Sequence, residues 1–186
     1  RKDATFFAHR LLPREHWRAQ PRFGTCYLDI ETTGLSKDNN IITVIGLYDG
    51  QNTHLLVNGK NMHIFPELIK QYDVMVTFNG TLFDVPFIKH HFPDAQMPCM
   101  HVDLRFLLQR LGLRGGLKRI EEQLGLNRSD DTTGLSGMDA VRLWHKYTRG
   151  DEDALKLLLA YNAEDIVNLQ DLMDYGYKQH CSLLQE

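Results

Sequence analysis

Two carboxylates, Asp29 and Glu31, stand two residues apart in the apolar segment 27–35. Apolar, aromatic and β-branched residues surround them and Thr33-Gly34 follows as a stop, a pattern that predicts a strand. Residues two apart share one face of a strand, so both carboxylates are expected to point the same way. Like charges this close favour a cation between them; the alternative is a solvated strand face that bears two acids.

A third acid, Asp84, follows an apolar run at 74–78 that predicts a buried strand. The chain turns at Asn79-Gly80, so Asp84 is expected in the first turn of the next helix. The alternative explanation is that the helix macrodipole favours an acid at this position.

A fourth acid, Asp165, follows Tyr161 by four residues within a long predicted helix. Residues spaced this way project from one face of a helix about a turn apart. Apolar neighbours such as Ile166 and Leu169 bring that face close to the core, where an ionised carboxylate without a partner is costly. We therefore expect Asp165 to have a partner.

Four oxygen donors without His or Cys favour Mg²⁺ or Mn²⁺ over Zn²⁺. Two such ions, about 3.5–4 Å apart, stabilise the attacking and leaving oxygens in phosphoryl transfer. The sequence therefore predicts a site for two divalent cations, Mg²⁺ or Mn²⁺, with four ligands: Asp29, Glu31, Asp84 and Asp165.

Three segments carry a family resemblance: Asp29-Ile-Glu31-Thr-Thr-Gly34, Asn79-x-x-x-Phe83-Asp84 and Tyr161-x-x-x-Asp165. In order and spacing they resemble the exonuclease motifs of the DEDD (DnaQ-like) superfamily. The third motif carries a tyrosine, and in this it resembles the DEDDy branch of the superfamily. Segments 116–126 and 139–144 most resemble the YprB-like ribonuclease H-like group. The resemblance covers about residues 23–178 and implies a ribonuclease H-like fold with 3′–5′ exonuclease activity.

The resemblance also implies a role for each residue of the site. Asp29 would bridge both metals, and Glu31 and Asp165 would complete the first metal site. Asp84 would hold the second metal, mostly through water. Tyr161 would orient the attacking water and help to deprotonate it, although an ordinary pKa of about 10 leaves most of the deprotonation to the metal.

The same resemblance implies a group of substrate-binding residues for the terminal nucleotide: Thr32, Thr33, Gly34, Leu35, Asn79 and Phe83. Bases that stack on apolar or aromatic side chains suit sequence-independent binding of single strands. For Leu35 and Phe83 the alternative is a turn residue and a core residue.

A basic cluster at 105–119 includes Arg114 and Lys118. Arg114-Gly115-Gly116 leads into a predicted helix, whose N-terminus could receive a substrate phosphate beside these two side chains. The favoured alternative is a solvated helix face that follows a glycine cap.

Strands are predicted at 25–30, 41–48 and 53–57, and the turn at 49–52 favours an antiparallel meander. Further strands are expected at 74–78 and 100–102. Helices are predicted at 61–71, 82–91, 104–111 and 117–124, and over almost all of 138–178 with a break at 149–151. This order predicts an α/β fold: a ribonuclease H-like mixed sheet, with an antiparallel three-strand meander plus parallel strands, flanked by helices.

Residues 1–22 form a basic N-terminal arm with six basic and two acidic residues, whereas the whole chain has a net charge of -3. Its apolar residues predict a packed segment, a short helix broken near Pro13, that covers a sheet edge rather than binding nucleic acid. Residues 23–180 are predicted to form the exonuclease domain.

The 186 residues, 42% of them hydrophobic, suffice for one core. Three dispersed cysteines predict reduced thiols in a cytoplasmic protein, and the absence of an apolar run of about 18 residues predicts no membrane partner. The first residue is Arg1, so we expect a trimmed chain or a piece of a longer one.

These patterns predict a metal-dependent nuclease that shortens single-stranded DNA or RNA from its 3′ end. Because the body of the chain is acidic, a partner domain or protein would add affinity for nucleic acid. Two alternatives remain: a non-catalytic nucleic-acid-binding or scaffolding domain of the same fold, and the proofreading fragment of a larger polymerase.

Overall fold

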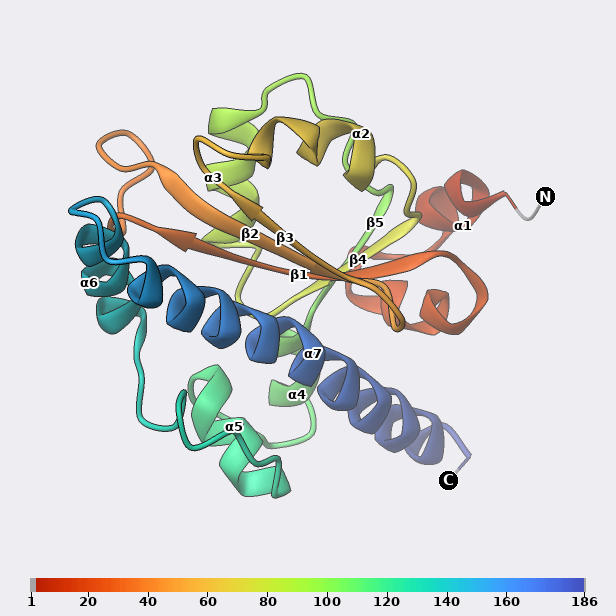
Figure 1. The fold of residues 1–186 in the computed structure, drawn as a ribbon. Helices are drawn as coiled ribbons and strands as arrows, with labels where there is room; N and C mark the ends of the chain where they lie inside the picture. Colours follow the sequence, from red (N-terminus) through yellow and green to blue (C-terminus); the bar gives the residue numbers. More distant parts are fainter. Residues whose placement is uncertain (1–2, 186) are drawn as a thin grey trace.

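The chain folds around one mixed five-stranded sheet in the computed structural model, which describes residues 3–185 (Figure 1). The strands lie in the order β3-β2-β1-β4-β5. The pairs β1/β2 and β2/β3 are antiparallel, whereas β1/β4 and β4/β5 are parallel. The bounds are β1 Thr25–Thr32, β2 Ile42–Tyr48, β3 Thr53–Val57, β4 Val74–Thr77 and β5 Met100–Asp103. The predicted meander, mixed sheet and all five strands are confirmed.

The helices follow the predicted order, with bounds that differ by a few residues. The α-helices are α1 Ala4–Arg10, α2 Phe65–Ile69, α3 Asp84–His91, α4 Leu104–Gln109, α5 Leu117–Leu124, α6 Gly137–Tyr147 and α7 Glu152–Leu183; the 3₁₀ helices are η1 Pro13–Arg18, η2 Gln20–Arg22 and η3 Met62–Ile64. The predicted break near residue 150 separates α6 from α7. Helix α7 is 32 residues long and is capped at its N-terminus by Asp151, whose side chain accepts a hydrogen bond from the Ala154 N–H.

The two faces of the sheet are covered by different helices (Figure 1). On one face, Leu28 and Ile30 of β1 share a core with Phe65 of α2 and Phe87 of α3. On the other face, α7 crosses the sheet and α6 packs beside it. Because neighbouring residues of β1 point to opposite faces, Asp29 and Glu31 lie on the α7 face.

The N-terminal arm packs against β5 at the sheet edge, as expected for an edge-covering segment. The backbone N–H of His101 in β5 donates to His16 Nδ1 at 3.2 Å. Trp17 is only 2% exposed and packs edge-on against Tyr177 of α7, with ring centroids 5.7 Å apart. The arm thus supplies a partner for the edge strand and a core residue, while Arg1 and Lys2 lie outside the described residues. The proposed domain boundary at residue 22 stays a prediction.

Within residues 3–185, the structure has no helix with the length and apolar character that crossing a membrane requires.

We expect Trp17→Ala to lower the free energy of unfolding by about 3–5 kcal/mol, because it empties a buried site between the arm and α7. Urea unfolding followed by circular dichroism measures this change. The matched control is Phe6→Ala, since Phe6 is 49% exposed on the same arm and should cost less than about 1 kcal/mol. Equal, small losses for both variants would mean that the arm is not part of the folded unit.

Candidate active site

Strand β1 and helix α7 bring three of the four predicted acids together. One carboxylate oxygen from each of Asp29, Glu31 and Asp165 can be chosen so that all three lie within 4.8 Å of one another, among the described residues. Glu31 and Asp165 are buried, and Asp29 is partly exposed. The side-chain alternation of β1 and the helical spacing of α7 thus place these three carboxylates side by side.

Asp84 stands slightly apart from this group, at the first residue of α3. It is 2% exposed, and its Oδ1 accepts a hydrogen bond from the Ile30 N–H of β1 at 3.1 Å. The carboxylate therefore ties the start of α3 to the strand that carries the other acids. Asp84 still lines the same cavity as they do.

The cavity at the acid cluster has a volume of about 530 Å³. Its lining includes most of the predicted site residues: Asp29, Glu31, Thr32, Gly34, Leu35, Asn79, Phe83, Asp84, Tyr161 and Asp165. Two apolar side chains on its rim are strongly exposed, Leu35 at 84% and Met138 at 61%. An apolar, open mouth thus leads to an acidic floor.

A glycine in β2 allows α7 to approach the acids. Gly46 pairs with Asp29 in the antiparallel register, and a Cβ at Gly46 would overlap the side chain of Asn162. In that space Asn162 reaches Asp29, and its Nδ2 donates to Asp29 Oδ2 at 2.9 Å. Because Gly46 has no side chain, α7 can lie close above the carboxylates.

The turn after β4 is held by Asp103, at the end of the neighbouring strand β5. Its carboxylate accepts the backbone N–H groups of Asn79 at 2.8 Å and Thr81 at 3.0 Å. Asp103 also caps α4, by accepting the Arg105 N–H. Asn79 has a φ of 63°, a left-handed conformation that asparagine tolerates better than most residues. This support fixes the turn where the backbone enters the cavity.

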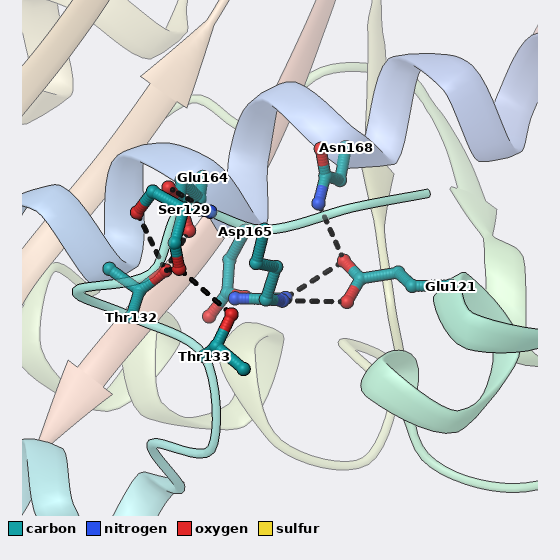
Figure 2. Close-up of polar contacts among 8 residues, drawn as sticks. Glu121, Ser129, Thr132, Thr133, Glu164, Asp165 and Asn168 are labelled. Carbon is teal, nitrogen blue, oxygen red and sulfur yellow. Dashed lines mark hydrogen bonds and ion pairs between the residues drawn. The ribbon is translucent and has the colours of Figure 1, made fainter. Parts of the chain in front are cut away.

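The expected partner of Asp165 is Arg128, in the loop of residues 125–136 between α5 and α6. An Arg128 Nη2–H donates to Asp165 Oδ1, and the same guanidinium binds both oxygens of Glu121 at 2.8 Å. Asn168 Nδ2 donates to Glu121 at 3.0 Å, and Figure 2 shows Glu121 of α5 facing Asn168 of α7. The Arg128 side chain is 7% exposed and the Glu121 side chain 2%.

A second acid of α7 holds the same loop. Glu164, the neighbour of Asp165, accepts hydrogen bonds from the Ser129 N–H and the Thr132 hydroxyl (Figure 2). Thr132 is fully buried. The 125–136 loop is therefore fastened to α7 by two consecutive acids, one through Arg128 and one through hydroxyl and backbone groups.

The acid cluster resists full ionisation. Burial, and then the charge of Asp84, raises the pKa of Asp29 well above its ordinary value. Burial, and then Asp165, does the same to the pKa of Glu31. The pKa of Asp165 rises only to about 6, because Arg128 offsets part of the burial. Oxygen donors that repel one another in this way fit a hard divalent cation, whose charge would relieve the repulsion.

Three predicted substrate-binding residues lie outside this cavity. The Thr33 hydroxyl accepts the Ile41 N–H at 3.1 Å and thus fixes the loop that precedes β2. Arg114 lines an adjoining cavity of about 620 Å³, which shares Asn79 with the acid-lined one. Lys118 lines a further cavity with Arg128, and its Nζ lies 4.5 Å from the ring centroid of Tyr161.

Sequence reasoning did not identify Arg128, Asn162, Met138 or Val141, although the last two line the acid-lined cavity. The need of Asp165 for a partner indicated a cation, but nothing in the spacing selects Arg128 from the other basic residues. Asn162 directly follows Tyr161 in the third motif, yet its contact depends on Gly46 in a different segment.

Comparison with known proteins gives a family and a fold. A family model described as the RNase_H superfamily matches residues 26–177. No curated protein sequence matches the chain at a significant level. Among solved structures, it is similar to the family B DNA polymerase of the hyperthermophilic archaeon Pyrobaculum calidifontis, with a TM-score of 0.64 and 14% identity over 84% of this chain. The chain spans only 24% of that polymerase.

Two smaller proteins share the fold over most of their length. A structure described as the apo form of a nuclease gives a TM-score of 0.58 at 21% identity, over 89% of this chain and 76% of the other. Brucella melitensis NrnC bound to pGG gives 0.56 at 16% identity, over 88% and 78%. At these identities the likeness establishes a shared ribonuclease H-like fold, as predicted.

The raised pKa of Asp84 predicts how pH changes the stability of the metal-free protein. Burial raises this pKa from 3.8 to about 7, so the folded state retains a proton that the unfolded state releases. The wild type should therefore lose stability as the pH rises from about 4 to about 7, relative to Asp84→Asn. The difference in free energy of unfolding between the two proteins should grow to about 4 kcal/mol by pH 7, measured by urea unfolding with EDTA. If the difference in free energy of unfolding between the two proteins did not depend on pH, a buried, protonated Asp84 would be contradicted.

Proposed function

The chain belongs to the RNase_H superfamily, and on that basis we propose that it is a metal-dependent nuclease that hydrolyses phosphodiester bonds from a 3′ end. The observation that carries this proposal is the convergence of Asp29, Glu31 and Asp165 within 4.8 Å, at the floor of an open cavity with apolar walls. The DEDDy branch and the YprB-like group remain the finer assignment that we propose from the motifs.

Asp29, Glu31 and Asp165 would hold two divalent cations, Mg²⁺ or Mn²⁺, together with Asp84 through water. Bound there, the cations would stabilise charge on the attacking and leaving oxygens of the phosphate. NrnC, which has the same fold, has been solved with bound Mg²⁺. All four carboxylates line one cavity in this chain, which supports a shared role for them.

Tyr161 would orient the attacking water. Burial, and next the charge of Asp165, raises the pKa of Tyr161 well above its ordinary range, so the hydroxyl keeps its proton. A protonated phenol donates a hydrogen bond, and we therefore assign Tyr161 to positioning the water rather than to removing its proton.

The apolar mouth of the cavity would hold the terminal nucleotide. Exposed Leu35 and Met138 offer surfaces on which a base can stack without sequence preference. The adjoining cavity bears Arg105 and Arg114, which would meet the phosphates further along the strand. Single-stranded DNA or RNA suits this arrangement. NrnC bound to pGG is one structure of this fold with a nucleic-acid ligand.

A binding module of the same fold is the main alternative function. Binding of a nucleic-acid backbone favours cations, whereas this cavity buries carboxylates that repel phosphates. A binding module has no use for this energetic cost, so the acids favour catalysis. The similarity to a polymerase keeps a proofreading role within the proposal, because such a role uses the same reaction.

The first test is hydrolysis of 5′-labelled single-stranded and duplex DNA and RNA, with Mn²⁺, Mg²⁺ or EDTA. We expect a ladder that shortens from the 3′ end, depends on the metal and is lost in Asp29→Ala by a factor of at least about 10³. Arg142→Gln is the control, because it breaks only an exposed ion pair with Asp139. Cleavage by Asp29→Ala at the wild-type rate would refute the site, and internal cuts would refute the exonuclease assignment.

Tyr161→Phe should slow hydrolysis by about 10²-fold, because it removes the hydroxyl and leaves the ring packing intact. Single-turnover rates measure this loss, and Mn²⁺ affinity from calorimetry should stay unchanged, since the hydroxyl is not proposed as a ligand. A wild-type rate in this variant would remove Tyr161 from the mechanism.

A further inference from the structure

Arg128 places a positive charge within the acid cluster. Its guanidinium donates to Asp165 Oδ1 and, through two bonds of 2.8 Å, to Glu121. The Arg128 side chain is 7% exposed, and its guanidinium carbon lies 5.7 Å from the ring centroid of Tyr161. Arg128 therefore contacts one proposed metal ligand directly and lies beside the proposed water-orienting residue.

The surrounding charges explain why a cation is held here. Glu31 and Asp165 are both at most 7% exposed, and Asp29 adds a third carboxylate to the same group. Without a counter-charge, ionised carboxylates this close and this buried would destabilise the folded chain. Arg128 supplies that counter-charge permanently, since a guanidinium keeps its proton at any ordinary pH. The loop is held in place independently by Glu164, so Arg128 is not needed merely to fasten the loop.

A divalent cation at Asp165 would meet two obstacles. One of the two carboxylate oxygens already accepts a hydrogen bond from Arg128. The guanidinium charge would also repel the incoming cation, because both would lie against the same largely buried carboxylate. A residue that only positioned Asp165 would strengthen metal binding, whereas a competing charge weakens it. These two roles predict opposite signs for the effect of removing Arg128.

We propose that Arg128 is a built-in counter-ion that competes with the divalent cation for Asp165, and thereby keeps the metal-free site folded at the cost of metal affinity. This inference rests on the proposed metal site. It adds a residue that acts through Asp165 and sets how much free metal the protein needs. Arg128 is a positioning and charge-balancing residue, not one that contacts the substrate.

The test is Mn²⁺ binding to the whole chain without nucleic acid, by calorimetry and by the electron paramagnetic resonance signal of free Mn²⁺. We expect Arg128→Gln to bind Mn²⁺ at least about tenfold more tightly than the wild type, because it removes the repelling charge and frees Asp165 Oδ1. Arg142→Gln makes the same change in net charge at an exposed pair and should leave the affinity unchanged.

Thermal unfolding supplies a second readout. Without metal, Arg128→Gln should melt at a lower temperature than the wild type, and saturating Mn²⁺ should raise its melting temperature by more. If Arg128→Gln fails to fold because Glu121 is left buried without its partner, Glu121→Gln/Arg128→Gln removes that charge too. This double variant still frees Asp165 Oδ1 and leaves the three-acid group intact, so it should also bind Mn²⁺ more tightly than the wild type.

The outcomes separate this inference from the proposed function. Mn²⁺ binding by the wild type that Asp29→Ala abolishes would support the metal site itself. If the wild type binds Mn²⁺ in this way, equal or weaker Mn²⁺ binding by the Arg128 variants would refute the proposed competition for Asp165. Arg128 would then only support Asp165. Absence of Mn²⁺ binding in the wild type and all variants would overturn the proposed metal site and this inference together.

Discussion

The repulsion among buried carboxylates is the constraint on which the rest of the structure depends. Five acids approach the junction of β1, α3, α5 and α7: Asp29, Glu31, Asp84, Glu121 and Asp165. Three of them have a partner that offsets part of this repulsion: the Ile30 N–H for Asp84, Asn162 for Asp29 and Arg128 for Asp165. These partners lower the cost but leave the three-acid group with an excess of negative charge. That excess is what a divalent cation would neutralise.

The scaffold concentrates this charge by joining two kinds of strand pairing at β1. On one side β1 pairs antiparallel with β2, where Gly46 leaves room for α7; on the other it pairs parallel with β4, whose end leads into α3. The central strand therefore receives acids from both sides without any long loop. A rigid sheet and a 32-residue helix hold the carboxylates in place against their repulsion. Carboxylates on flexible loops would move apart and so relieve that repulsion.

The sequence predicted the parts of the fold and site that depend on local periodicity. Alternation in β1 placed Asp29 and Glu31 on one face, and the spacing of Tyr161 and Asp165 placed both on the buried face of α7. The partner choices could not be predicted, because Arg128 and Asn162 act across 37 and 133 residues of sequence and depend on helix packing. Helix ends also shifted by a few residues, since terminal turns fray and tertiary contacts decide them.

The edge strand β5 connects the arm to the proposed substrate turn. At one residue, His101, the strand's backbone N–H is satisfied by His16 of the arm, and two residues later Asp103 holds the backbone of Asn79. These contacts lie two residues apart in β5, so the arm and the turn after β4 are held by the same short strand segment. The basic arm therefore supports the site indirectly. It pairs with the edge strand β5, and the last residue of β5, Asp103, holds the turn that forms part of the cavity wall.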